Sequence, residues 1–312
     1  MKQVPVLITW DVDPDRWAEE QLRKRALSMA LDLCEEFGVR STFFITANFA
    51  HEYADHIKRM QALRQEIGCH GLSHTDEEDY DRMPEAMQRT YLEEATRKLE
   101  CATGGPVRVF RSPRVKTSAI TLRLLAEQGY LTDSSVCSQR LDLISSNLIN
   151  VGWLLAPRRP YHPHRTSPFR RGDLPIWEIP ISAVGIPFLS KTLNVLGLPM
   201  MKMLFRTLYA ESIHTGKPIV YLSHPTEFIR TRSQGAGHWV RRLPWLFSPS
   251  RIRTHGLLIR NQLLRMDGES LFNCSREFFA YMASFPGVSF VTGSEYVEQF
   301  ANHIRSDRLT CL

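Results

Sequence analysis

The chain has 312 residues, of which 43% are hydrophobic and 23% charged, a balance typical of a soluble globular protein. Its net charge is +6, and its six cysteines form no Cys-x-x-Cys pair, which argues against a disulfide framework and a structural zinc knuckle. We find no export signal and no apolar run of about 18 residues, and therefore expect a cytoplasmic protein, with the inner face of the membrane as a further option.

Short apolar runs alternate with amphipathic segments along most of the chain. The predicted strands are residues 4–9, 41–46, 66–69, 107–111, 130–136, 176–181, 217–224 and 288–292. The predicted helices are residues 16–37, 52–65, 83–101, 118–128, 270–285 and 294–304. This alternation, without an internal repeat or a long linker, predicts one α/β domain with a parallel, barrel-like sheet.

Two segments interrupt this pattern. Residues 150–215 form an inserted segment that is rich in Pro and Arg over 158–171 and apolar over 184–209. The apolar part fits a lid, a membrane-surface helix or, as the favoured interpretation, core. Residues 230–257 are basic and aromatic and are predicted to be a loop.

Acidic residues stand at the end of the first predicted strand. Asp11 and Asp13 are two positions apart, so in an extended chain both carboxylates lie on one face. Side chains just past the carboxyl end of a barrel strand commonly carry the chemistry of the protein. We therefore expect both carboxylates to enter one cleft.

Two histidines follow the third predicted strand. His70 and His74 are four residues apart and would share one face if this segment were helical. Two imidazoles can share a metal ion, but a catalytic zinc site usually takes a third protein ligand from elsewhere in the chain. Further along, Arg111 follows the fourth strand and His224 ends the strand of residues 217–224.

Taken in order, these motifs resemble those of the polysaccharide deacetylase family, the NodB-homology domain of carbohydrate esterases. The matching stretches are Thr9-Trp10-Asp11-Val12-Asp13, His70–His74, Arg111-Ser112-Pro113-Arg114 and Leu222-Ser223-His224, with Tyr130–Ser135 as a less regular fourth motif. The resemblance covers residues 4–230 and extends to about residue 303. It implies a single distorted (β/α) barrel with about seven parallel strands.

The sequence departs from the family pattern in three places. The acidic pair is Asp-Val-Asp rather than Asp-Asp, and Gly71 stands where Ser or Thr is usual. The tryptophan-containing fourth motif of secreted chitin deacetylases is absent, which argues against a crystalline or long-chain polymer as substrate.

The resemblance also implies a metal-dependent hydrolase of amides. Asp13, His70 and His74 would hold a divalent cation, with Zn²⁺ as the first choice and Fe²⁺, Co²⁺, Ni²⁺ or Mn²⁺ as alternatives. Asp11 would act as the general base and His224 as the general acid.

Other residues near these motifs receive supporting roles. Arg111 would pair with Asp11, and a plain structural ion pair is an equal alternative. Pro113, Arg114 and Asp133 are candidate substrate contacts, and Asp133 is also a candidate partner of His224. Glu178 and Glu227 lie near the motifs without an assigned role.

The expected substrate is an N-acylated amino sugar, which could be phosphate- or lipid-linked, with peripheral membrane contact as a related option. A deformylase or a hydrolase of small cyclic amides or imides is the alternative on the same fold. A non-catalytic carbohydrate-binding protein is the alternative from another class. We expect no nucleic-acid partner, because the arginines form no known binding module. The oligomeric state is left open.

Overall fold

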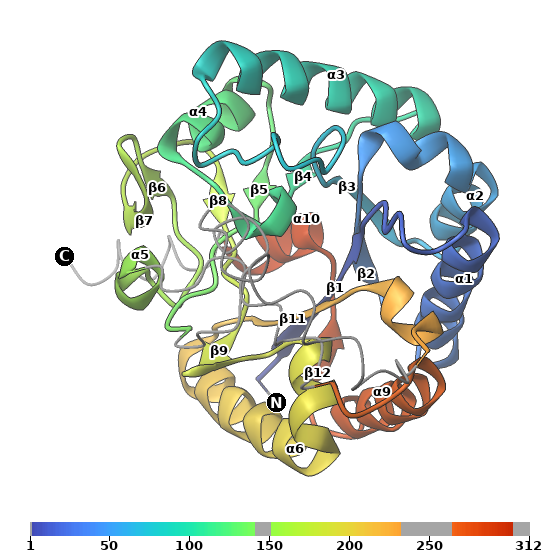
Figure 1. Cartoon of the computed structure of the whole chain (residues 1–312). Coiled ribbons are helices and arrows are strands. Elements are labelled where there is room, and N and C mark those ends of the chain that lie inside the picture. Colours follow the sequence, from blue (N-terminus) through green and yellow to red (C-terminus); the bar gives the residue numbers. More distant parts are fainter. Residues whose placement is uncertain (1, 141–150, 232–263, 302–312) are drawn as a thin grey trace, which may run out of the picture.

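Strand β1 (Val4–Val12) pairs with three other strands of a curled parallel sheet (Figure 1). The computed structural model describes residues 2–140, 151–231 and 264–301. The main path of the sheet runs β11-β1-β2-β3-β4-β5-β8, and β12 pairs with the start of β1. The other strands are β2 (Ser41–Ile45), β3 (Glu66–Cys69), β4 (Val109–Phe110), β5 (Thr132–Asp133), β8 (Trp177–Glu178), β11 (Ile219–Ser223) and β12 (Val288–Phe290).

All pairings within this sheet are parallel, which confirms the predicted barrel-like α/β architecture with about seven strands in the main path. Helices pack around the outside of the sheet (Figure 1). The longer ones are α1 (Glu20–Glu36), α2 (Ala54–Ala62), α3 (Glu85–Thr103), α4 (Ala119–Glu127), α6 (Ser190–Thr215) and α9 (Gly268–Ala283). The shorter ones are η1 (Ala47–Tyr53), η2 (Pro113–Val115), α5 (Val151–Leu155), η3 (Pro225–Ile229), α10 (Gly293–Tyr296) and η6 (Val297–Ala301).

The apolar sequence of β1 is explained by its position. All nine residues of this strand are buried, as expected for a parallel strand covered on both faces. It continues three residues beyond the predicted end because its register with β2 extends to Asp11↔Phe44 and Val12↔Ile45. Asp11 is therefore part of the strand, and Asp13 is the first residue beyond it.

The inserted segment contains two antiparallel hairpins and the long helix α6. The hairpins are β6 (Pro163–His164) with β7 (Ser167–Arg171), and β9 (Ala183–Val184) with β10 (Ile186–Pro187). Helix α6 is kinked at Gly197, where φ is 77°, and its buried Leu204, Phe205 and Leu208 belong to the main hydrophobic core. Of the three interpretations of the apolar part, the structure matches core.

No helix within the described ranges combines the length and hydropathy needed to cross a membrane. The predicted basic loop at 230–257 falls almost entirely on residues 232–263, which lie outside the described residues.

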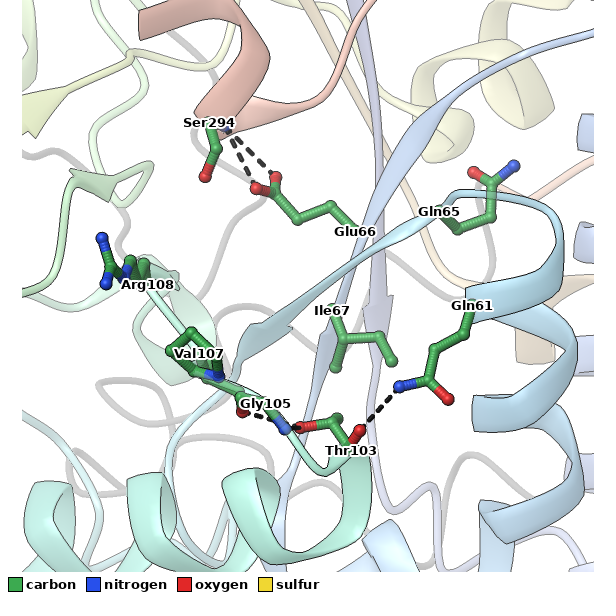
Figure 2. Close-up of a pocket in the computed structure, with 10 residues that line it drawn as sticks. Gln61, Gln65, Glu66, Ile67, Thr103, Gly105, Val107, Arg108 and Ser294 are labelled. Atoms are coloured by element: carbon green, nitrogen blue, oxygen red, sulfur yellow. Dashed lines mark hydrogen bonds between the residues drawn. The ribbon is translucent and has the colours of Figure 1, made fainter. Parts of the chain in front are cut away.

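A cavity of about 230 Å³ lies at the amino-terminal edge of the sheet (Figure 2). It is lined by Gln65, Glu66, Val107 and Arg108, among others. The Glu66 carboxylate accepts the backbone N–H of Ser294 at 3.1 Å, which ties α10 to the start of β3. The histidine pair follows the opposite end of β3, so this cavity and the candidate site lie at opposite edges of the sheet.

Candidate metal centre

The histidine pair lies on a loop after β3, so the condition of a helical segment, under which the two imidazoles would share one face, is not met. Gly71 and His74 have φ values of +74° and +53°, which interrupt any helix between residues 70 and 74. A Cβ added at Gly71 would lie 2.5 Å from Oε1 of Glu78, which explains glycine at this position. The loop brings the two imidazoles together, with 5.3 Å between the ring centroids of His70 and His74.

The loop is organised by Glu78, a residue to which sequence reasoning gave no role. Its buried carboxylate accepts the backbone N–H groups of Leu72, Ser73 and His74 at 2.6, 2.7 and 2.6 Å. It also accepts the hydroxyl of Tyr80 at 3.0 Å. A buried carboxylate with this many donors fixes the loop backbone, and thereby the position of the second imidazole.

Replacing Glu78 with alanine should weaken metal binding about 10- to 100-fold, because three loop N–H groups lose their acceptor. Glu78→Gln keeps one carbonyl acceptor and should show a smaller loss. The measurement is competition with a chromophoric chelator. Glu77→Ala is the matched control, since Glu77 is exposed. Equal metal affinity in folded Glu78→Ala and wild type would contradict this role of the loop.

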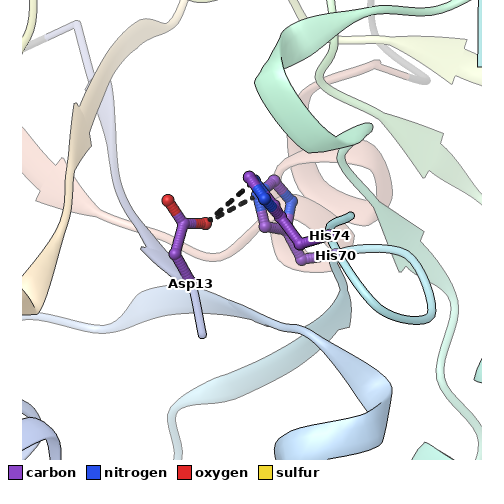
Figure 3. A group of neighbouring side chains, drawn as sticks. All are labelled: Asp13, His70 and His74. Atoms are coloured by element: carbon purple, nitrogen blue, oxygen red, sulfur yellow. Dashed lines mark ion pairs between the residues drawn. The ribbon is translucent and has the colours of Figure 1, made fainter. Parts of the chain in front are cut away.

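Asp13, His70 and His74 converge on one point (Figure 3). Oδ1 of Asp13 lies 3.1 Å from Nε2 of His70 and 3.4 Å from Nε2 of His74. This oxygen is buried without a well-directed hydrogen bond. Candidate ligand atoms of all three residues lie within 4.8 Å of one another. A set of two nitrogens and one carboxylate oxygen fits a divalent transition-metal cation.

The surroundings of these three residues favour the orientation and the protonation states in which their ligand atoms can bind a cation. Nδ1 of His70 lies 2.8 Å from the carbonyl oxygen of Arg111, and donation to it leaves Nε2 directed at Asp13. Burial tends to raise the pKa of Asp13, but the charge of His74, the close approach of His70 and the charges of His224 and His70 outweigh it and hold the pKa far below its usual range. Burial lowers the pKa of His74. Asp13 is thus held as the carboxylate.

Asp11 lies beside the convergence point and is anchored by Arg111. Nη1 of Arg111 donates to Oδ1 of Asp11 and to Oγ1 of Thr9, both at 2.8 Å. Nε of Arg111 donates to the carbonyl oxygen of Ser134 at 2.8 Å, and the arginine is completely buried. The other carboxylate oxygen of Asp11 lies 3.9 Å from Nε2 of His70. The structure therefore brings together the pair that the motifs suggested.

His224 approaches from the opposite side, directly after β11. Its Nε2 lies 3.7 Å from Oδ2 of Asp13, and its Nδ1 lies 3.3 Å from Oε1 of Glu227. Burial and Lys191 lower the pKa of His224, but Glu227 and Asp13 outweigh them and raise it. Glu227, which had no role assigned from the sequence, is the ion-pair partner of this imidazole. The signal for it is its spacing, three residues after His224 and one turn into η3.

Asp133 is not the partner of His224. Its fully buried carboxylate accepts the hydroxyl of Ser135 at 2.5 Å. On the neighbouring strand it is paired in register with Glu178, which accepts the backbone N–H of Val136 at 3.0 Å. Burial raises the pKa of Asp133 to about 6 and raises that of Glu178 well above its usual range, to which the charge of Asp133 adds. These two carboxyl groups form an interior acid pair.

This acid pair should make the protein less stable as the pH rises. In the unfolded chain both carboxyls lose their protons near pH 4, at about their reference pKa values. In the folded chain the two carboxyl groups keep their protons to higher pH. Their contribution to the free energy of unfolding is therefore complete below about pH 4 and is lost as the pH rises through about 6. We expect the Asp133→Asn variant to lose less free energy of unfolding between pH 5 and 7.5 than wild type, by on the order of 1 to 3 kcal/mol. Urea titrations at both pH values measure this, and parallel curves would contradict it.

Pro113 and Arg114 pack against the histidine loop. Arg114 donates from Nε to Asp79 at 2.8 Å and from Nη2 to the carbonyl oxygen of Thr75 at 2.7 Å. Its Nη1 lies 3.4 Å from Nδ1 of His74. Arg114 therefore supports the loop behind the second imidazole, and contact of either residue with a substrate stays a prediction.

Comparison with known sequences identifies relatives of the first part of the chain. A family model described as polysaccharide deacetylase matches residues 1–132. A chitin deacetylase of Pestalotiopsis sp is 33% identical over 106 residues, which are 33% of this chain and 35% of that protein. The match therefore spans about a third of the length of this relative.

Solved structures with low sequence identity share the fold over nearly the whole chain. A Mycobacterium smegmatis protein assigned to the polysaccharide deacetylases has a TM-score of 0.61 at 19% identity, covering 98% of this chain and 92% of its own. The allantoinase PuuE has a TM-score of 0.59 at 18% identity, covering 95% of this chain and 91% of its own.

The family match and the fold agree with the motifs from which the site was built. The matched residues carry Asp11, Asp13, His70, His74 and Arg111. Residues 1–132 therefore match the polysaccharide deacetylase family, and the described chain shares the distorted (β/α) barrel fold of the similar solved structure.

Proposed function

We propose that this protein is a metal-dependent hydrolase that removes the N-acetyl group from an amino sugar. The observation that carries the proposal is the convergence of Asp13, His70 and His74, with an anchored carboxylate on one side and an oriented imidazole on the other. The family match of residues 1–132 supports an amide-cleaving activity, and the chitin deacetylase relative supports an acetylated sugar as the substrate class.

Asp13, His70 and His74 would hold the cation, with Zn²⁺ as the first choice and Fe²⁺, Co²⁺, Ni²⁺ or Mn²⁺ as alternatives. When bound, such a cation polarises the acyl oxygen and lowers the pKa of a water molecule. The ligand set is supplied by the end of β1 and by the loop after β3, so its geometry depends on the pairing of β1, β2 and β3.

The remaining groups of the site would accept and donate protons during the reaction. Asp11 would accept the proton of the attacking water, and the ion pair with the Arg111 guanidinium would keep that carboxylate directed at the site. His224 would donate a proton to the departing amine, with Glu227 holding the imidazole by Nδ1. The proposed base thus comes from β1, and the proposed acid from the residue that follows the neighbouring strand β11.

The substrate, as proposed, is a small or precursor glycan, either free or phosphate- or lipid-linked. A cytoplasmic location with contact at the inner face of the membrane would suit such a precursor. The same site could also serve a deformylase or a cyclic amide or imide hydrolase, because amide cleavage needs the same groups whatever the acyl substituent. The oligomeric state stays open.

Release of acetate from N-acetylated mono- and oligosaccharides by the zinc-supplemented protein tests the proposal. Activity should fall at least about 100-fold on chelation and return with added metal. His74→Ala should lose both the metal and the activity, while His214→Ala, an exposed position on α6, should keep both. Formate or a ring-opened product in place of acetate would favour the alternatives. Absence of metal from metal-replete wild-type protein would refute the site.

A further inference from the structure

The loop after β1 meets the segment after β11 at an exposed tryptophan beside the candidate metal centre. The Trp17 side chain is 54% exposed, yet its ring is fixed, because Nε1 donates to Oδ1 of Asp15 at 2.8 Å. The other oxygen of Asp15 accepts the hydroxyl of Thr226. The indole is thus held at its polar edge by groups next to the ligand set, while much of its apolar surface faces solvent.

An arginine accompanies this indole. The guanidinium of Arg230 lies 5.7 Å from the ring centroid of Trp17, within the range of a cation–π contact. Within the described ranges, Arg230 makes no ion pair. Two arginines of the Pro- and Arg-rich segment differ in this respect, because Arg158 pairs with Glu211 and Arg165 pairs with Asp173 at 2.9 Å. Among the described residues, the donors of Arg230 therefore have no carboxylate partner, and an external anion could bind them.

We propose that Trp17 and Arg230 form a subsite for a glycosyl phosphate, with the sugar ring on the indole and the phosphate on the guanidinium. The inference rests on the proposed function and specifies the substrate class of that site. A fixed aromatic face packs against the C–H groups of a pyranose ring at low entropic cost, because the ring is already ordered. A planar guanidinium presents paired N–H donors that match phosphate oxygens.

Chain connectivity keeps this pair close to the reacting groups. Trp17 is four residues after Asp13, and Arg230 is six residues after His224. At roughly 3.5 Å per residue, the Cα atom of Trp17 lies within about 14 Å of that of Asp13, and the Cα atom of Arg230 within about 21 Å of that of His224. The direct bonds of Asp15 to both flanking segments shorten this further. The proposal places the phosphate substituent of the sugar at Arg230 while its acetamido group occupies the candidate metal centre.

Binding of N-acetylglucosamine 1-phosphate, N-acetylglucosamine and inorganic phosphate to the zinc-supplemented protein tests the subsite, by calorimetry and saturation-transfer NMR. Wild type should bind the sugar phosphate at least about tenfold more tightly than the neutral sugar. Arg230→Gln should remove that difference. Trp17→Ala should weaken both sugars, and Trp17→Phe should restore part of the affinity. A short isoprenyl phosphodiester of the sugar distinguishes a lipid-linked source from a free sugar phosphate.

Arg165→Gln and Met203→Ala are the matched controls, since both positions are exposed and lie on other elements, between β6 and β7 and on α6, and neither should change the affinities. Equal affinity of wild type for the sugar and its phosphate would overturn the phosphate contact. Unchanged affinity of folded Trp17→Ala would overturn the stacking contact. Sugar binding that depends on Trp17 without acetate release would leave the subsite standing and refute the proposed reaction. Acetate release with an unchanged KM in Trp17→Ala and Arg230→Gln would support the proposed reaction and refute the subsite.

Discussion

Replacing His224 with glutamine should lower kcat for acyl release about 10²- to 10⁴-fold, the usual contribution of a positioned general acid. The reason is geometric, because the imidazole faces the ligand set through Nε2, 3.7 Å from Oδ2 of Asp13, and is held from behind by Glu227. Metal content should stay unchanged, since Asp13, His70 and His74 remain in place. Steady-state kinetics with elemental analysis of the same preparations measure both quantities.

Two further variants make this result specific. Glu227→Gln keeps a hydrogen-bonding side chain at Nδ1 but removes its charge, so we expect a smaller loss of kcat and a shifted pH profile. His214→Gln, on the exposed side of α6, should leave kcat unchanged. If His224→Gln retained full turnover with full metal occupancy, another group would have to protonate the leaving amine.

Arg111→Met should destabilise the fold by about 3 to 5 kcal/mol, because it leaves the Asp11 carboxylate buried without its partner. The lost donors also leave Oγ1 of Thr9 and the carbonyl oxygen of Ser134 without an Arg111 hydrogen bond. The free energy of unfolding from urea titration at constant pH gives the cost directly.

The second substitution in a double-mutant cycle separates charge from packing. Removing both members of a buried ion pair is commonly far less costly than removing one. Asp11→Val combined with Arg111→Met should therefore cost at least about 1 kcal/mol less than the sum of the two single changes. Strict additivity would mean that the 2.8 Å contact between these groups carries no net stabilisation, and that Arg111 acts only through its neutral hydrogen bonds.

The sequence was sufficient for the groups at the carboxyl ends of regular strands. Asp11, Asp13 and His224 stand at the ends of apolar runs, and parallel strands bring such ends to one edge of the sheet. Arg111 could be placed for the same reason, because it follows β4. The periodicity of these strands is local, and for this reason it could be read without knowledge of the tertiary contacts.

The sequence was insufficient where backbone shape depends on distant or irregular contacts. The spacing of His70 and His74 suggested a helix, but the left-handed conformations at Gly71 and His74 are stabilised by the Glu78 carboxylate. Nothing in the acidic run that contains Glu78 distinguishes it from its exposed neighbour Glu77. Asp133 was misplaced for a similar reason, since its neighbour across β5 and β8 lies 45 residues further along the chain.

The pairing of β1 with β11 brings together parts of the chain that are far apart in the sequence. The proposed metal ligands all lie within the first 74 residues, whereas the proposed proton donor is residue 224. These parts meet through the parallel register that aligns Thr9 with Leu222 and Trp10 with Ser223. A nascent or truncated chain could thus contain a complete ligand set and still lack the acid. The reactive centre is therefore complete only after β11 has paired with β1.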